Sequence, residues 1–321
     1  MKNILITGGA GFIGSNLCTY LLKKKFNIYA LDNLSVGKKS NLTSSKIKFI
    51  KKDILDINKI KFGKKINIVI HLAARAEILI PKEKENLYYN SNILGLQSVL
   101  NFAANHKVEK FIFASSASVY GDTKNHKVKE SFSLCPQHYY AYTKYIGEKM
   151  IESYCNINNL KYVIFRFFNV YGIKSNAVVS KFIAQKVQRK KITIYGDGNQ
   201  KRDFIHIDDL NKAIYKSIKI KKVKNEIFNI GSGNAISILK LKNIISSDNN
   251  HIHLKKRNDD IEISISDIRK IRNKLKWKPS VNFKKGVKEM EKSDKSRLIN
   301  VKIPSVKNQV KLIKKFNSSS K

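Results

Sequence analysis

The feature that most constrains the fold of this chain is a glycine-rich turn near its amino terminus. Residues 8–14 read Gly-Gly-Ala-Gly-Phe-Ile-Gly, directly after an apolar run at 3–7 and before a helical pattern. Glycines at these spacings allow a tight turn, a close approach of the backbone to a ligand, and close packing of helix on strand. The first N–H groups of the helix favour a pyrophosphate. The placement between strand and helix predicts a dinucleotide site, with contacts at Gly8, Gly11, Phe12, Ile13 and Gly14.

Short β-branched runs alternate with helical segments along the first half of the chain. The runs are almost continuously apolar, as expected for strands that helices cover on both faces. This alternation predicts an α/β protein with a doubly wound parallel sheet, the Rossmann fold. The predicted strands are 3–7, 27–31, 48–52, 67–71, 111–114 and 162–167, and the main predicted helices are 90–105 and 140–156.

The second half of the chain is less regular and predicts a smaller α/β domain that binds the substrate. Its expected helices are 178–189 and 208–220, and its expected strands are 192–195 and 226–230. We expect a cofactor domain over 1–168 and a substrate domain over 169–292, partly interleaved with the first. Residues 293–321 are polar and lysine-rich without a clear period, which predicts a loosely held tail.

Polar and small residues follow the second, third and fourth predicted strands. Asp32 stands 18 residues after Gly14, where a carboxylate accepts hydrogen bonds from an adenosine ribose and repels a 2′-phosphate. This favours NAD over NADP. The alternative is that these residues have structural roles only. The aspartates would then be ordinary turn or loop residues, and the small residues would only pack in the core. The predicted cofactor contacts at these strand ends are Asp32, Asn33, Asp53, Ile54, Leu72, Ala73 and Ala74.

Three side chains suggest proton transfer coupled to hydride transfer. Tyr140 and Lys144 lie one helical turn apart, and Ser116 stands at the end of the fifth predicted strand, where ligands bind in open parallel sheets. The Tyr-x-x-x-Lys spacing alone is common in a chain with 14 tyrosines and many lysines. A tyrosine of ordinary pKa, about 10, is a poor base at neutral pH. A neighbouring Lys⁺ and a cationic nicotinamide ring both lower the pKa of the phenol. The phenolate then takes a proton from a substrate hydroxyl while Ser116 holds that hydroxyl.

Taken together, the motifs over about residues 1–285 resemble the extended short-chain dehydrogenases/reductases. Within them, the chain is most similar to the nucleotide-sugar epimerase/dehydratase group, and especially to UDP-glucose 4-epimerases. The motifs that carry this resemblance are HLAA at 71–74, NILG at 92–95, SSASVYGD at 115–122, YAYTK at 140–144, RFFNVYG at 166–172, GDGNQKRDFIHIDD at 196–209, NIGSG at 229–233 and LKWKP at 275–279.

The resemblance implies roles for further residues. Asn92 and Phe168 would contact NAD, as would Tyr140 and Lys144. Asn169 would contact the nucleotide-sugar together with Ser116 and Tyr140. Arg202 and Arg257 would clamp the diphosphate, a task that suits a guanidinium because it forms bidentate, charge-assisted bonds to phosphate. The resemblance also implies a homodimer formed through the helices around 92–105 and 140–154.

The implied reaction is epimerisation of a UDP-sugar at carbon four through a 4-keto intermediate. Related 4,6-dehydratases and decarboxylases carry one or two carboxylates directly after the catalytic hydroxyl residue, whereas this chain has Ala117 and Ser118. Alternatives are a dehydratase or reductase of the same group and, from another class, a non-catalytic Rossmann protein that binds NAD(H) or RNA. Glu77 and Ile78 depart from the family pattern near the sugar, so glucose, N-acetylglucosamine, glucuronate and pentoses all stay open, as does strict use of UDP.

The composition bears on partners and location. The net charge is +39, but lysine supplies nearly all of it and the lysines are spread along the chain, so we expect no specific nucleic-acid partner. No apolar run approaches the roughly 20 residues of a membrane span, and the opening strand leaves no room for a signal peptide. Three scattered cysteines favour neither a disulfide framework nor a metal site. We therefore expect a cytoplasmic protein without a metal.

Overall fold

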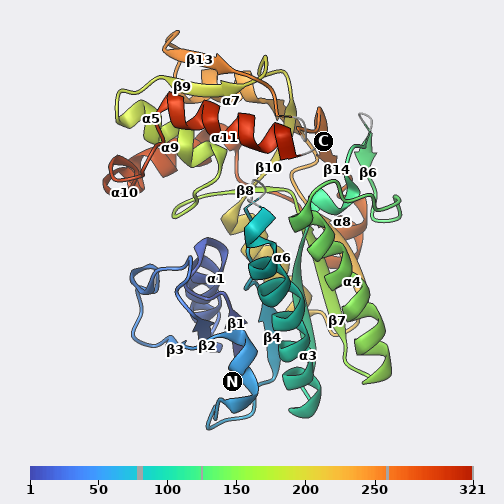
Figure 1. Ribbon diagram of the computed structural model, residues 1–321. Helices are drawn as coiled ribbons and strands as arrows, with labels where there is room; N and C mark the ends of the chain where they lie inside the picture. The colour runs from blue at the N-terminus through green and yellow to red at the C-terminus, as the bar shows by residue number, and fades with distance from the viewer. Residues whose placement is uncertain (78–81, 124–125, 258–259, 320–321) are drawn as a thin grey trace.

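A computed structural model describes residues 1–77, 82–123, 126–257 and 260–319 of the chain. Its largest element is a seven-stranded sheet of order β11-β7-β5-β4-β1-β2-β3, in which every neighbouring pair is parallel (Figure 1). The chain order reverses between β1 and β4, which confirms the predicted doubly wound fold. The strands are β1 Asn3–Thr7, β2 Asn27–Asp32, β3 Lys48–Lys51, β4 Ile68–His71, β5 Lys110–Ser116, β7 Tyr162–Phe167 and β11 Glu226–Ile230.

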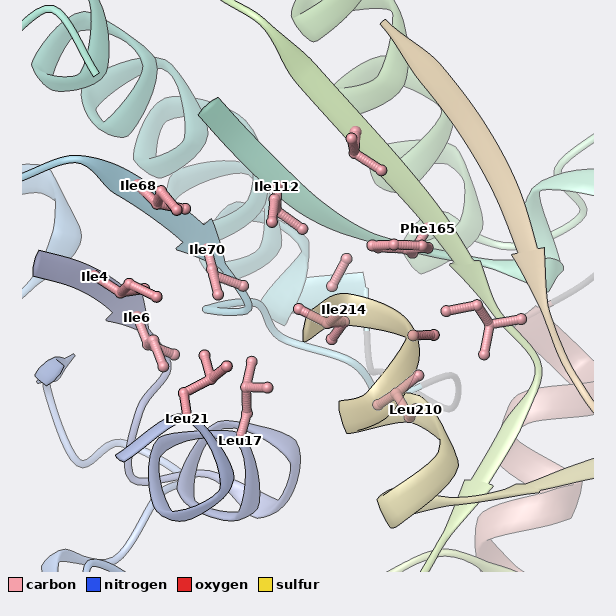
Figure 2. Close-up of a cluster of buried hydrophobic side chains, with 14 of the residues drawn as sticks. Ile4, Ile6, Leu17, Leu21, Ile68, Ile70, Ile112, Phe165, Leu210 and Ile214 are labelled. Atoms are coloured by element: carbon pink, nitrogen blue, oxygen red, sulfur yellow. The ribbon is translucent and has the colours of Figure 1, made fainter. Parts of the chain in front are cut away.

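Helices cover both faces of this sheet. Figure 2 shows Leu17 and Leu21 of α1 (Phe12–Lys23) and Leu210 and Ile214 of α6 (Ile207–Lys219) pointing at one face. Successive strand residues point to opposite faces. Ile4 and Ile6 accordingly pack with these helices, while Leu5 packs on the other face. The second face is covered by α3 Gly95–Asn105, α4 Tyr139–Ile157 and the short helix η2 Ile54–Lys59.

A smaller group of elements lies beyond the carboxyl edge of the large sheet (Figure 1). Its main strand β10 pairs with β8, β12 and β14, and β6 extends the sheet at β14. A second ribbon pairs β9 with β13. The elements are β6 Lys127–Val128, β8 Asn169–Tyr171, β9 Ile192–Tyr195, β10 Lys201–His206, β12 Ala235–Ser237, β13 His251–Leu254, β14 Ile263–Ser266, α5 Val178–Val187, α7 Ile238–Ile245 and α9 Phe283–Ser293. Helix α8 Arg269–Leu275 packs instead in the core beside β11 and α6.

The chain crosses between the two groups more than once. Strand β11 and helix α6 come from the second half of the sequence but belong to the large sheet and its covering layer. Strand β6 comes from the first half but pairs with β14 of the smaller sheet. None of the described helices is long and apolar enough to cross a membrane.

Two predicted segments differ in the structure. The predicted helix 90–105 begins earlier, as α2 Glu85–Tyr88, and continues through a π-helical turn, η4 Tyr89–Leu94, into α3. The predicted loose tail is wrong, because it forms α10 Lys295–Ile299 and α11 Val306–Ser319. Leu298 is completely buried among the apolar side chains of α5 and α9, and Gln188 donates to the carbonyl oxygens of Leu298 and Val301. These contacts are distant in sequence, so local periodicity did not reveal them.

Candidate active site

The glycine turn after β1 presents backbone rather than side chains. Gly8 has a φ of +68°, and a Cβ on Gly14 would collide with the carbonyl oxygen of Gly8. Gly11 caps α1 in an extended conformation, without a side-chain cap from any described residue, and the first turn of α1 contains no acidic residue. The first N–H groups of the helix, at Phe12 and Ile13, are therefore suited to an anion such as a pyrophosphate.

Asp32 supports the rim of this turn. Its carboxylate is buried, and it accepts hydrogen bonds from the backbone N–H of Ala10 at 3.0 Å and of Leu34 at 2.8 Å. Each carboxylate oxygen has two lone pairs, so further acceptor capacity remains for a ribose. Asn33 donates to Asp53 at 2.7 Å, so the ends of β2 and β3 are joined at the edge where the adenosine half of a dinucleotide is predicted.

The other predicted cofactor contacts at strand ends are residues 72–74 and Ile54, and the structure places them differently. The segment 72–74 runs directly beside the glycine turn: the backbone N–H of Ala73 donates to Thr7 at 3.3 Å, and a Cβ on Gly8 would lie 2.8 Å from that nitrogen. Ile54 behaves differently. Its side chain is buried against Gly95 in the core under α3, so only its backbone is placed to face an adenine.

Asn92 lies in the π-helical turn and joins three segments. Its side-chain oxygen accepts from the backbone N–H of Arg75 at 2.8 Å, and its amide donates to the carbonyl of Arg75 at 3.0 Å and to Thr143 at 2.9 Å. Both donor hydrogens are therefore used within the protein. Asn92 therefore holds the loop after β4 against helix α4, which carries Tyr140 and Lys144. Its contact with NAD stays a prediction.

The three predicted catalytic residues come together at the carboxyl edge of the sheet. Ser116 ends β5, Tyr140 lies in the first turn of α4, and the two side chains are hydrogen-bonded. The Nζ of Lys144 lies 5.9 Å from the centroid of the Tyr140 ring and donates to the carbonyl of Ala114 at 2.8 Å. Strand β5 thus fixes both the serine and the lysine relative to the phenol.

Burial controls the ionisation of this pair. Tyr140 keeps part of its surface exposed, yet the surrounding protein raises its pKa to about 12, and the hydrogen bond from Ser116 only partly offsets this. Burial also lowers the pKa of Lys144 to about 7, against the opposing effect of Glu148. The protein groups by themselves therefore do not lower the pKa of Tyr140, because desolvation outweighs the effect of Ser116. The predicted lowering, to which the cationic nicotinamide of bound NAD contributes, stays a prediction.

A buried ionic network behind the site was missed from the sequence. Glu148, one turn beyond Lys144 on α4, pairs with Arg166 of β7, with Nη2 and Oε2 2.7 Å apart. Ser115 donates to Glu148, and Arg166 donates to the Tyr120 hydroxyl at 2.8 Å. The network ties α4 to β5 and β7 directly beneath the catalytic residues. The available signal was a glutamate four residues after Lys144, on the same helical face.

Phe168 and Asn169 lie at the junction of the two sheets. Phe168 is buried against Val119 and Tyr120, and its backbone N–H donates to Ile230 of β11 at 2.9 Å. Asn169 begins β8, opposite Phe204, and is partly exposed. The structure thus places both between the catalytic edge and the smaller sheet; their contacts with nicotinamide and sugar stay predictions.

The structure brings Arg202 and Arg257 together around one carboxylate. Both guanidinium groups pair with Oδ1 of Asp260, that of Arg257 at 3.3 Å. Asp203, the carboxylate next to Arg202 in the sequence, is buried and accepts hydrogen bonds from Ser232 and Ser266 instead. The two guanidinium groups thus converge on one point, and a guanidinium is suited to bidentate, charge-assisted bonds with a diphosphate.

The loop next to the predicted sugar site is only partly described. Glu77 accepts a hydrogen bond from Tyr88 at 2.8 Å, which together with other hydrogen bonds holds the pKa of Glu77 below its usual value, although burial acts against them. Ile78 lies outside the described residues. Among the described residues, no group of three or more His, Cys, Asp or Glu side chains is arranged to hold a metal ion.

Comparison with known proteins agrees with this geometry. Residues 4–231 match the model of the NAD dependent epimerase/dehydratase family. A putative UDP-glucose 4-epimerase of Methanocaldococcus jannaschii is 35% identical over 302 residues, covering 89% of this chain and 96% of the relative.

Two solved structures extend the comparison. The UDP-glucose 4-epimerase of Thermotoga maritima, solved with UDP-glucose, has a TM-score of 0.87 at 31% identity. The UDP-glucuronic acid 4-epimerase of Bacillus cereus, solved with UDP-glucuronic acid and NAD, has a TM-score of 0.86 at 32% identity. In each case 92% of this chain covers 99% of the other chain. The chain therefore belongs to the NAD-dependent epimerase/dehydratase family, in its nucleotide-sugar epimerase group, and its cofactor is NAD.

Proposed function

We propose that this protein inverts the carbon-four hydroxyl of a UDP-sugar through a 4-keto intermediate. The observation that carries the proposal is the hydrogen-bonded pair of Ser116 and Tyr140 above Lys144, at the sheet edge that also bears the glycine turn. The positions after Ser116 are Ala117 and Ser118, which supply no carboxylate for a dehydration or decarboxylation. Removal and return of a hydride at one carbon is the chemistry that these groups support.

Tyr140 acts as the base in this proposal. NAD, when bound, accepts the hydride from carbon four and returns it. The phenolate of Tyr140 takes the hydroxyl proton as the carbonyl forms and gives it back when the alcohol is restored. The Ser116 hydroxyl orients the sugar oxygen toward Tyr140. Lys144, fixed on the Ala114 carbonyl, places a cationic side chain below the ring and favours the phenolate.

Arg202 and Arg257 anchor the other end of the substrate. The two guanidinium groups that converge at Asp260 would hold the diphosphate, and the sugar would then reach the catalytic edge. We also propose the division into a cofactor domain over 1–168 and a substrate domain over 169–292, partly interleaved with the first because β11 and α6 belong to the large sheet and its covering layer. Family resemblance and the two converging guanidinium groups support these assignments.

A homodimer through α2–α4 is part of the proposal, with a revised set of contacts. Leu96 and Leu100, which lie within the predicted interface range 92–105, are fully buried within the protomer. The apolar side chains that this region does expose are Leu87, Tyr89, Leu94 and Tyr142, which are 40–50% exposed. In this proposal the four side chains, which lie on α2, η4 and α4, are covered by the same surface of a second copy.

The direct test is turnover of a panel of UDP-sugars: UDP-glucose, UDP-N-acetylglucosamine, UDP-glucuronate and UDP-xylose. The proposal predicts that at least one yields its carbon-four epimer without net formation of NADH, and that Tyr140→Phe loses at least about 100-fold in rate while keeping its fold. A 4-keto-6-deoxy product would show a dehydratase. NAD binding without turnover of any of these sugars would show a binding protein.

A further inference from the structure

This chain is longer than the related structures to which it was compared. In both structural comparisons 92% of this chain covers 99% of the other chain, so this chain carries a surplus that those proteins lack. The family motifs end with Lys-Trp-Lys-Pro at 276–279, well before α10 and α11. We therefore place the surplus in the segment that forms α11, drawn in red across the smaller group of elements in Figure 1.

One residue of α11, Gln309, is buried and hydrogen-bonded through both its side-chain oxygen and its side-chain nitrogen. Its side-chain oxygen accepts from the Tyr195 hydroxyl at 3.1 Å, and its amide donates to the carbonyl of Pro304 at 2.8 Å. Only 8% of Gln309 is exposed, whereas its neighbours Lys307 and Asn308 face solvent. A buried amide is costly unless donor and acceptor are both satisfied, as they are here. The orientation of Gln309 is thus fixed from both sides.

Tyr195 connects Gln309 to the arginine cluster. The guanidinium carbon of Arg257 lies 5.9 Å from the centroid of the Tyr195 ring. The carbonyl of Tyr195 also accepts from Gln200 at 2.7 Å, and the same Gln200 amide reaches Asp260 at 3.2 Å. Tyr195 therefore contacts the cluster through its ring and, by way of Gln200, through its backbone.

We propose that Gln309 is a positioning residue for the nucleotide diphosphate, holding Tyr195 against Arg257 so that Arg257 and Arg202 stay converged on one point. The proposal rests on the diphosphate role given to these arginines above. It makes the carboxyl-terminal helix a part of the substrate site. A guanidinium that is already oriented loses less conformational entropy when it binds a phosphate, so loss of Gln309 would weaken binding without touching the chemical step.

The test is titration of UDP into the full-length protein loaded with NAD. Gln309→Met keeps the length of the side chain but removes its hydrogen bonds, and Tyr195→Phe removes the same bond from the other side while keeping the ring. Asn308→Ala, on the exposed face of α11, is the matched control. Each of the two variants should raise the Kd for UDP about three- to tenfold, and the double variant no more than the larger single effect, because both remove one interaction. KM for the sugar nucleotide should rise in parallel, with kcat, NAD content and the control unchanged.

The possible outcomes separate this proposal from the one on which it rests. If Gln309→Met binds UDP within twofold of the wild type and only loses thermal stability, α11 is a structural clip and the proposal is wrong. The same conclusion follows if kcat falls while UDP affinity is kept. Arg202→Ala serves as the reference: if it also binds UDP normally, the diphosphate role of the cluster fails, whereas a loss confined to Arg202→Ala rejects only the role of Gln309.

Discussion

Glu148 and Arg166 form an ion pair in the interior of the protein, one helical turn beyond Lys144. The side chains of both are at most 3% exposed. Removing one partner of such a pair leaves an uncompensated buried charge, which costs about 3–5 kcal/mol. We expect Arg166→Met to lower the free energy of unfolding, measured in urea, by this amount.

The matched control for this variant is Arg269→Met. Arg269 also makes a bidentate pair, with Asp267, but its side chain is 71% exposed. Exposed pairs contribute roughly 0–1 kcal/mol, so the control should be nearly neutral. Equal effects in the two variants would show that burial of Glu148 does not determine the result.

The buried amine of Lys144 predicts a stability that depends on pH. Its pKa falls from 10.5 to about 7 on folding, so between pH 7 and pH 10.5 the unfolded chain binds more protons than the native protein. The free energy of unfolding contributed by this group therefore rises with pH across that window. Comparison with Lys144→Met, measured in urea at pH 7.5 and 9.5, isolates the effect. The wild type should gain stability relative to the variant at the higher pH, and a difference that does not change with pH would contradict the lowered pKa.

Arg202 should act on substrate binding rather than on chemistry. A clamp on the diphosphate is equally strong in the ground and transition states, so its loss raises KM and leaves kcat largely intact. We expect Arg202→Ala to weaken UDP binding roughly 10- to 100-fold, with normal NAD content. Arg202→Lys should restore only part of the affinity, because an ammonium cannot reproduce the two-pronged contact of a guanidinium. Normal UDP affinity with a lowered melting temperature would mean that Arg202 only holds Asp260 and its loop.

The proposed dimer interface on α2–α4 predicts that a charged residue introduced there separates the dimer into monomers. Tyr142 is 50% exposed there, and a carboxylate at this position would face its own copy across a two-fold axis. Tyr142→Glu should convert a dimer to a monomer at micromolar concentration in light scattering. Ile299→Glu, which charges an equally exposed apolar residue on α10, is the control and should leave the dimer intact. A monomeric wild type would end the proposal.

The local sequence pattern predicted most strands of the large sheet. It did not predict the elements that form only through contacts with residues distant in the sequence. The strands β9 Ile192–Tyr195 and β11 Glu226–Ile230 match their predicted bounds, since each is a short apolar run between turn residues. Strands β6 and β12 have two and three residues and exist through their partners, so no periodicity marks them. The helices of the carboxyl-terminal segment were missed for the same reason.

The candidate site shows the same division. Ser116, Tyr140 and Lys144 were found because their spacing and the position of Ser116 at a strand end are written in the sequence. The pairing of Arg202 with Asp260 was not predicted, because 58 residues separate the two and other aspartates stand closer to Arg202 in the chain. The effect of burial on the pKa of Tyr140 was also not predicted, because burial is a property of the folded protein.

The central claim is that one hydride leaves carbon four and returns to the same carbon. The most direct measurement uses the best UDP-sugar of the panel, deuterated at carbon four, and follows the label in both epimers by NMR. The account predicts that the product epimer keeps deuterium at carbon four, gains none of the solvent hydrogen there, and forms without net reduction of NAD. Deuterium found at carbon six, or lost to solvent, or an unchanged sugar with every UDP-sugar of the panel, would contradict it.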